Sequence, residues 1–267
     1  MSICMILSAV AFSITLLLGP VVSVLASWLG AMDRPGELST HPRPIPRTGG
    51  LAILAGVAAA ATGARWGGLL PAEYTEGLAG ILIGGVVIAM VGLLDDTRHI
   101  SPLVKSLGQF LAASIVIGFG VQVHFLPWVG IGLALTLLYL VGGSNAINLL
   151  DGMDGLAAGV AAIAALSLGL IGLARGQPLV VVLASTLLGG VLGFLPLNFP
   201  RARLFLGDVG SLFLGFTLTC CAVLLTDTPY DLLGLAAPLA VLGLPALDTA
   251  LALVRRFRRR NDLFTGD

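Results

Sequence analysis

The sequence predicts an all-α, polytopic membrane protein, a bundle of about nine transmembrane helices. Of its 267 residues, 57% are hydrophobic and only 10% are charged, and the mean hydropathy is +1.02. Soluble domains carry about 25% charged residues. Apolar segments also recur along the whole chain at close to the roughly 20 residues that a spanning helix needs. We therefore expect a single integral-membrane domain over residues 1–267.

Nine segments meet that length requirement. In chain order they are 3–28, 49–70, 78–94, 103–121, 126–147, 155–173, 178–197, 209–226 and 232–254. The first lacks a basic start and a cleavage site, which favours a retained span over a signal peptide. The second is the least regular because Arg65 and Trp66 interrupt its end. Internal Gly and Pro are tolerated because neighbouring helices re-satisfy the backbone.

Positive charges divide the connecting segments into two sets. Twelve of the 14 Lys and Arg residues fall in alternate connections, and only Arg65 and Arg175 fall in the others. Because cytoplasmic loops are enriched in Lys and Arg, this predicts an outside N-terminus and a cytoplasmic C-terminus. The acidic motifs lie on the cytoplasmic side, which favours a substrate made in the cytosol. The net charge of zero argues against a nucleic-acid partner.

Two adjacent carboxylates close the third predicted span. Asp95 and Asp96 point in different directions on a regular helix, but at a helix end both can face one polar cavity. Paired carboxylates bind a hard cation such as Mg²⁺ or divide the roles of ligand and base. The alternative is a hydrated pair that caps the span. Lys105, the only lysine, is either an interfacial anchor or a point charge for a phosphate.

Four polar residues lie at intervals of three across and beyond the end of the fifth predicted span: Asn145, Asn148, Asp151 and Asp154. On a helix they form one polar stripe. Such a stripe can join helices through hydrogen bonds. Its carboxylates make that role unfavourable, because each must be paired or neutralised. Ionisable groups at membrane spans usually serve a function, so the stripe is interpreted as part of a binding surface.

A glycine-flanked aspartate, Asp208, begins the eighth predicted span. A tight turn would let it reach a metal ion, and the alternative is a helix N-cap formed by Asp208 or Ser211. Phe205, just before it, can offer an aromatic face to a base.

The first cytoplasmic loop, residues 41–50, is basic and is stiffened by three prolines. Gly49 and Gly50 are expected to leave backbone N–H groups free near a helix N-terminus, where anions bind well. Arg47 lies beside them. The alternative is a loop that touches anionic lipid headgroups.

In this order, the motifs resemble those of the polyprenyl-phosphate N-acetylhexosamine-1-phosphate transferases, an integral-membrane family within glycosyltransferase family 4. The shared phrases are P-x-P-R-x-G-G, L-D-D, N-A-x-N-x-x-D-G-x-D-G-L-A-A-G, F-x-G-D-x-G-S and L-D-T with an arginine run. The resemblance implies transfer of a sugar-1-phosphate from a UDP-N-acetylhexosamine to undecaprenyl (polyprenyl) phosphate, with release of UMP. The reaction would take place at the cytoplasmic face of a bacterial inner membrane, as the first membrane step of cell-surface polysaccharide synthesis.

The resemblance also implies roles for individual residues. Asp208 would be a Mg²⁺ ligand, with Mn²⁺ as an alternative cation. Asp95 and Asp96 would be the catalytic pair, one of them a base on the lipid phosphate or a partner of the metal.

The remaining implied roles concern the donor. Asn148 and Lys105 would hold the diphosphate, while Asp154 and Phe205 would contact the uracil. The substrate-binding set is completed by Arg47, Asn145 and Asp151.

Some alternatives stay open. Thr-Arg-His follows the paired aspartates where the muramoyl-pentapeptide branch usually has a lysine, which favours the branch that initiates O-antigen, teichoic-acid or capsule synthesis. A phospho-N-acetylmuramoyl-pentapeptide transferase is the alternative within the family. From another class, an ion-coupled transporter also places carboxylates in broken helices, but near the bilayer midplane. The choice of N-acetylhexosamine and the existence of a homodimer are left undecided.

The family continues past its last cytoplasmic segment into a histidine-rich loop, typically H-x-H-H, and one or two further spans. This sequence stops at Leu263-Phe-Thr-Gly-Asp267, where that loop would begin. The chain is therefore expected to be truncated at its C-terminus, to lack part of the sugar-phosphate site, and to show weak or no transferase activity by itself.

Overall fold

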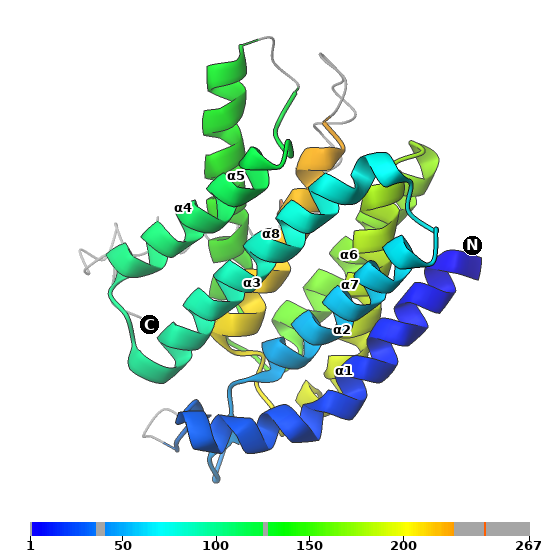
Figure 1. The fold of residues 1–267 in the computed structure, drawn as a ribbon. Coiled ribbons are helices and arrows are strands. Elements are labelled where there is room, and N and C mark those ends of the chain that lie inside the picture. The colour runs from blue at the N-terminus through cyan, green and yellow to red at the C-terminus, as the bar shows by residue number, and fades with distance from the viewer. Residues whose placement is uncertain (1, 36–40, 125–127, 227–242, 244–267) are drawn as a thin grey trace.

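The computed structural model describes residues 2–35, 41–124, 128–226 and 243 as a helix bundle with one small hairpin (Figure 1). The helices are α1 (Ser2–Leu29), α2 (Gly49–Trp66), α3 (Thr75–Arg98), α4 (Pro102–Gly118), α5 (Val129–Leu150), α6 (Leu156–Ala174), α7 (Pro178–Asn198) and α8 (Gly207–Leu224), with a short 3₁₀ turn, η1 (Ala72–Tyr74), before α3. Strands β1 (Met32–Asp33) and β2 (Ile45–Pro46) pair antiparallel, with Met32 opposite Pro46.

Within the described residues, eight of the nine predicted spans coincide with helices. Six of these helices are long and apolar enough to cross a membrane, and α4 is a shorter apolar helix. The ninth predicted span, 232–254, falls outside the described residues except at position 243. A polytopic membrane helix bundle is therefore supported. The boundaries differ in one consequential way: α3 continues through Arg98, so Asp95 and Asp96 belong to its last turn.

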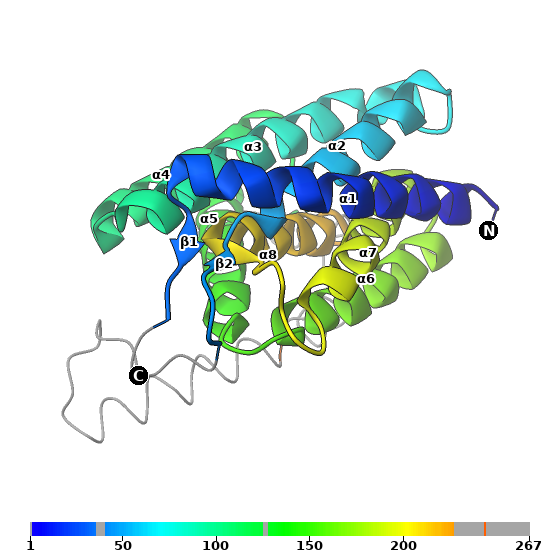
Figure 2. The same cartoon turned by 90° about the horizontal axis from the view of Figure 1, so that it is seen from below.

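Helix α8 lies at the centre of the bundle. It packs against α3 and α5, while α7 packs against α1, α2 and α6 (Figures 1 and 2). In α8, 89% of the apolar stretch is buried within the protein, whereas in α1 only 28% is buried. Large apolar side chains such as Leu17 on α1 and Leu138 on α5 are exposed on the outside. So much exposed apolar surface would be unfavourable in water and suits a lipid environment.

Glycines allow α8 to approach its neighbours at backbone contact. A Cβ added to Gly215 would lie 2.5 Å from the Gly143 carbonyl oxygen and 2.7 Å from the Ser144 Cα atom. A Cβ on Gly92 of α3 would collide with the backbone of Asp208 at the start of α8. Small residues at such crossings are the usual means of close helix packing in membranes. They bring the ends of α3, α5 and α8 together, and those ends carry the polar residues.

Substituting Gly215 by valine should therefore separate α5 from α8. Overpacking of this kind costs about 1–3 kcal/mol, so we expect a clearly lower unfolding temperature for Gly215→Val in detergent. The matched control is Gly142→Val, because a Cβ at Gly142 on α5 meets no atom within 4 Å. Equal unfolding temperatures for the two variants would contradict the close contact.

Candidate functional site

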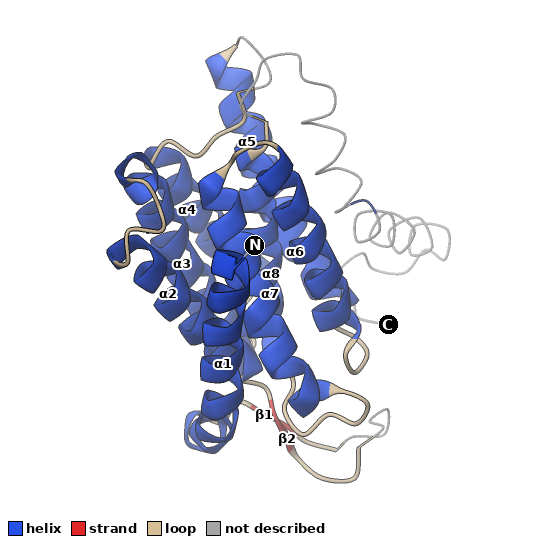
Figure 3. Ribbon diagram, turned by 90° about the vertical axis from the view of Figure 1, so that its right-hand side faces the viewer, coloured by secondary structure: helices blue, strands red, loops and turns tan. Residues whose placement is uncertain are grey.

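Four helix ends meet beside the β1–β2 hairpin at one end of the bundle (Figure 3). They are the C-terminal ends of α3 and α5 and the N-terminal ends of α4 and α8. The turn into α8 depends on Gly207, which has a φ of 71° and whose Cβ would clash with Arg47 and Asp96. Asp208 is thus the second residue of α8. The alternative expectation that Asp208 or Ser211 forms the N-cap is wrong, since Leu206 occupies the N-cap position and makes no side-chain capping hydrogen bond.

The Lys105 ammonium group joins the carboxylates at this convergence. Its Nζ atom lies 2.9 Å from Asp95 Oδ2 and donates a short hydrogen bond to Asp208 Oδ2. It also lies 3.3 Å from Asn148 Oδ1. The Asn148 amide nitrogen in turn donates to Asp208 Oδ1 at 3.0 Å and to Ser211 Oγ at 2.8 Å. We call Asp95, Lys105, Asn148 and Asp208 the lysine cluster.

The lysine cluster carries an excess of negative charge. Two carboxylates share one ammonium group, and the side chains of Lys105, Asp95 and Asp208 are only 17%, 18% and 18% exposed. Carboxylates that are largely buried need a counter-charge, because removing them from water is costly. Two carboxylates and an amide oxygen are also donors that a hard divalent cation prefers. Within the described residues, no group of three or more His, Cys, Asp or Glu residues could hold a metal ion by itself.

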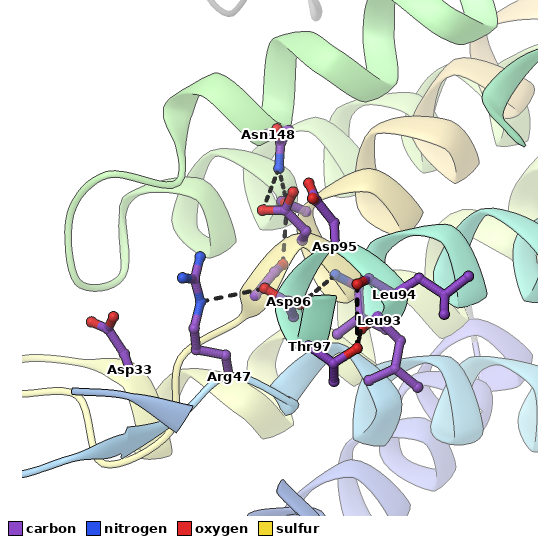
Figure 4. Close-up of polar contacts among 12 residues, drawn as sticks. Asp33, Arg47, Leu93, Leu94, Asp95, Asp96, Thr97 and Asn148 are labelled. Carbon is purple, nitrogen blue, oxygen red and sulfur yellow. Dashed lines mark hydrogen bonds and ion pairs between the residues drawn. The ribbon is translucent and has the colours of Figure 1, made fainter. Parts of the chain in front are cut away.

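At the end of α3, the Asp96 side chain points in a different direction from that of Asp95 (Figure 4). Its side chain is fully buried. Oδ1 forms an ion pair with Arg47 Nε at 3.3 Å, and Oδ2 accepts a hydrogen bond from the Val209 backbone N–H at 3.1 Å. The two adjacent carboxylates therefore reach α8 from different sides. Asp95 is part of the lysine cluster, whereas Asp96 joins α3 to the α8 N-terminus and to the loop before α2.

The polar stripe is divided by the tertiary structure. Asn148 belongs to the lysine cluster. Asn145, one turn earlier on α5, is engaged by Gln109 of α4 through reciprocal amide hydrogen bonds of 3.0 and 2.8 Å. Asp151 and Asp154 follow the end of α5 and lie in a neighbouring cleft. Gln109 was not anticipated, although its position four residues after Lys105 places both on one face of α4.

The cleft has a volume of about 350 Å³. It is lined by Asp33, His41, Arg47, Asp151, Gly152, Met153, Asp154, Asn198, Phe205 and Gly207. Asp154 is held in place by accepting a hydrogen bond from the Ala202 backbone N–H at 3.0 Å. The Asn198 side chain joins the segment after α5 to the segment before α8. It accepts a hydrogen bond from the Gly155 N–H at 2.8 Å and donates one to the Leu204 carbonyl at 3.1 Å. Asp33 and Asn198 are cleft residues that the motif analysis missed.

Backbone hydrogen bonds join three separate segments along this cleft. Phe205 N–H donates to the Pro46 carbonyl at 2.8 Å, and Gly49 N–H donates to the Phe205 carbonyl at 3.0 Å. Gly50 N–H donates to the Leu206 carbonyl at 3.0 Å. The expectation that Gly49 and Gly50 leave free donors for an anion is therefore wrong. These glycines serve close packing, since a Cβ on Gly50 would overlap the backbone of Gly210.

The cleft also contains a perturbed carboxyl group. Burial raises the pKa of Asp151 to about 7; the negative charge of Asp208 acts in the same direction and Arg47 opposes it. An unfolded aspartate titrates near about 3.9. Because the folded pKa is the higher one, protonated Asp151 contributes stability that is complete below about pH 4 and is lost as the pH rises toward 7.

The substitution Asp151→Asn should remove that loss. We expect both proteins to unfold at similar temperatures near about pH 4, and the variant to unfold at the higher temperature near about pH 8. Thermal unfolding in detergent across this pH range measures the difference. A difference in unfolding temperature between the two proteins that does not change with pH would contradict the raised pKa of Asp151.

The chain was compared with known proteins. A profile of the family described as Glycosyl transferase family 4 matches residues 78–226, the region that contains the lysine cluster. The "Probable undecaprenyl-phosphate N-acetylglucosaminyl 1-phosphate transferase" of Bacillus subtilis (strain 168) is 35% identical over an alignment 279 residues long. The alignment covers 98% of this chain and 75% of that protein.

Two further relatives extend the comparison. The "Decaprenyl-phosphate N-acetylglucosaminephosphotransferase" of Mycobacterium leprae (strain TN) is 38% identical over 92% of this chain and 70% of its own length. The "Phospho-N-acetylmuramoyl-pentapeptide-transferase" of Desulforudis audaxviator (strain MP104C) is 35% identical over 82% of this chain and 75% of its own length. With the family profile covering more than half of its residues, this chain belongs to glycosyl transferase family 4.

Proposed function

We propose that the protein transfers N-acetylglucosamine-1-phosphate from UDP-N-acetylglucosamine to undecaprenyl phosphate or a related polyprenyl phosphate, with release of UMP. The observation that carries this proposal is the lysine cluster, in which two carboxylates, an amide and an ammonium group from four helices meet at one end of an apolar bundle. The names of the relatives that are 35% and 38% identical to the chain support the same reaction class.

The proposal includes an arrangement in the membrane. It has nine spans, an outside N-terminus and a site at the cytoplasmic face of a bacterial inner membrane. The charge asymmetry of the connecting segments supports the orientation. A long prenyl chain can then stay in the bilayer against the apolar outer surface, while its phosphate reaches the polar end of the bundle. A site at one end of the bundle suits a membrane-surface reaction better than an ion-coupled transporter, whose sites lie near the midplane.

The chemistry joins two polyanions. An oxygen of the lipid phosphate forms a bond to the β-phosphorus of the UDP-sugar, and the bond from that phosphorus to the bridging oxygen breaks. UMP leaves with the bridging oxygen and the electron pair. Such a transfer needs mainly charge neutralisation and positioning. Lys105 in the lysine cluster and Arg47 at the cleft are the cationic side chains placed to provide both.

A divalent cation fits the lysine cluster. The oxygens of Asp208, Asp95 and Asn148 already converge on one cation, the Lys105 ammonium group, and an excess negative charge remains there. Mg²⁺ is usually bound through one or two carboxylates together with substrate phosphates. We propose Asp208 as its principal ligand, with Asp95 next to it. When bound, the ion would neutralise charge on the diphosphate.

The two adjacent carboxylates take different roles in this proposal. Asp95 faces the lysine cluster and is the one placed to contact the lipid phosphate and accept a proton from it. Asp96 is fully buried and engaged by Arg47 and by the Val209 N–H, so it has no path to the lipid phosphate. We propose that Asp96 positions Arg47 and the N-terminus of α8.

The cleft is proposed as the site of the donor nucleotide. Its volume of about 350 Å³ falls within the usual range for small-molecule sites, about 300–1,000 Å³. Phe205 can stack on the uracil, and Asp154 can accept hydrogen bonds from it. Asp151 and Arg47 lie between this region and the lysine cluster, where the diphosphate would pass. Asn145 is outside this path because Gln109 engages it, and we propose that it supports Asn148 through α5.

The proposed reaction is tested by transfer of label from radioactive UDP-N-acetylglucosamine to a butanol-extractable polyprenyl lipid, with release of UMP. The assay includes the 267-residue chain and the same chain joined to the C-terminal segment of the Bacillus subtilis relative, because the match covers 75% of that relative's length. UDP-N-acetylmuramoyl-pentapeptide serves as the competing donor. Absence of labelled lipid with the joined chain would overturn the proposal, and preference for the competing donor would assign the other branch.

In the active form, Asp208→Asn and Asp95→Asn should each lower transfer by at least about 100-fold, because charge stabilisation at the reacting phosphate is lost. Both variants should still insert into the membrane and remain monodisperse. The matched control is Glu76→Gln, which removes an exposed carboxylate from the opposite end of the same helix as Asp95. The transfer rate of this variant should stay within about twofold of the wild-type rate. Substantial Mg²⁺-dependent turnover by either aspartate variant would sink the assignment of the lysine cluster.

Asp96→Asn should behave differently. Removing one partner of a buried ion pair leaves the other without its counter-charge and destabilises the fold. We expect a lower unfolding temperature for Asp96→Asn than for Asp95→Asn, which leaves Arg47 and Val209 with their partners. Thermal unfolding of the two purified variants measures this difference. A larger decrease in unfolding temperature for Asp95→Asn than for Asp96→Asn would refute the division of roles.

A further inference from the structure

His41 forms hydrogen bonds at both ring nitrogens. Its Nδ1 atom lies 2.8 Å from the Arg43 carbonyl oxygen, and its Nε2 atom lies 2.9 Å from Asp33 Oδ2. A carbonyl oxygen and an ionised carboxylate only accept hydrogen bonds, so each ring nitrogen must carry a proton. A neutral imidazole has one such proton. The geometry therefore requires an imidazolium cation, with Asp33 as its counter-ion.

The charges around His41 favour this state. Among the described residues, Asp33 on β1 contacts the ring directly, and Asp154 from the segment after α5 acts on it at longer range. The hydrogen bond to Asp33 raises the pKa of His41, and the Arg43 carbonyl and Asp154 act in the same direction. Arg43 contributes its backbone oxygen. The other titratable groups that line the cleft are Arg47 and Asp151.

The His41 ring also packs against the ring of Phe205. The ring centroids are 5.6 Å apart and the planes are inclined by 67°, an edge-to-face arrangement. The Phe205 backbone is already fixed by its hydrogen bonds to Pro46 and Gly49. Those bonds do not fix the side-chain torsion. The ring contact with His41 adds a restraint on the Phe205 side chain at the cleft.

The hairpin itself does not depend on His41. Met32 and Asp33 pair with Pro46 and Ile45, and Arg47 N–H donates to the Ala31 carbonyl at 2.9 Å. Loss of the imidazole would leave this backbone pairing in place. An effect on the Phe205 ring can therefore be separated from an effect on the fold.

We propose that His41 is a positioning residue for the nucleobase: its imidazolium, anchored to Asp33, holds the Phe205 ring in the orientation in which the ring stacks on uracil. This rests on the proposed function, because it takes a uridine nucleotide as the occupant of the cleft. Immobilising a side chain on binding is costly. A Phe205 ring held beforehand avoids that cost, whereas a free ring must be ordered by the nucleotide.

The test is equilibrium binding of UMP to the full chain in detergent, by titration calorimetry. His41→Ala and the more conservative His41→Gln should each weaken UMP binding by roughly threefold to tenfold, the effect of ordering one side chain. Their unfolding temperatures should stay close to wild type. Ribose-5-phosphate, which lacks the base, should bind the variants and the wild type equally. His124→Ala, at an exposed histidine beyond the far end of α4, is the matched control and should bind UMP as wild type does.

Two further readouts separate positioning from a general structural role. In a Phe205→Ala background, adding His41→Ala should cause no further loss, because His41 acts through that ring. As the pH rises and the imidazolium loses its proton, wild-type binding of UMP should weaken, and His41→Gln should show no such trend.

The outcomes are distinguishable. If the wild type binds no UMP, the proposed function fails and the role of His41 fails with it. If the wild type binds UMP and His41→Ala binds it equally well, only the role of His41 is overturned. Additive losses with Phe205→Ala, or an equal loss for ribose-5-phosphate, would also overturn it.

Discussion

Pairing of buried charge is the constraint on which the rest of this structure depends. A carboxylate at the end of an apolar helix must find a cation or a hydrogen-bond donor, because lipid and packed side chains offer neither. Asp95 and Asp208 meet this requirement by sharing the Lys105 ammonium group, and Asp96 meets it through Arg47 and the α8 N-terminus. These contacts join α3, α4, α8 and the loop before α2 at one place. In the proposed function, the same contacts form the site of the divalent cation, through which the phosphates would be held.

The fold supplies two adjacent compartments of different character. The lysine cluster is enclosed by helix ends and carries excess negative charge, which suits a metal ion and phosphate. The cleft is wider and combines the Phe205 ring with polar groups, which suits a nucleotide. The ion pair between Arg47 and Asp96 lies between them. A substrate that has a base at one end and a diphosphate at the other would extend across both compartments.

Close backbone packing makes this arrangement rigid. Gly50 meets the backbone of Gly210, Gly92 meets that of Asp208, and Gly215 meets that of Gly143. Side chains at these positions would push α2, α3 and α5 away from α8, and the polar ends would separate. Hydrogen bonds from the first loop to Phe205 and Leu206 add a second restraint that does not depend on side chains. The abundance of glycine in the motifs thus has a packing reason in this chain.

The sequence by itself determined the class of the protein, since its apolar segments are long enough to span a bilayer and predicted eight helices within the described residues. It also singled out the candidate site residues, because ionisable groups are rare enough in an apolar chain to stand out. Only the tertiary structure decided which of them meet. Periodicity placed Asn145 and Asn148 on one stripe, yet Gln109 and Lys105 from α4 give them different partners. Likewise, Asp95 and Asp96 are adjacent in sequence but point in different directions at a helix end, and no local pattern reveals which neighbour lies on each side. Those partners come from segments up to 113 residues away, and their meeting depends on helix packing.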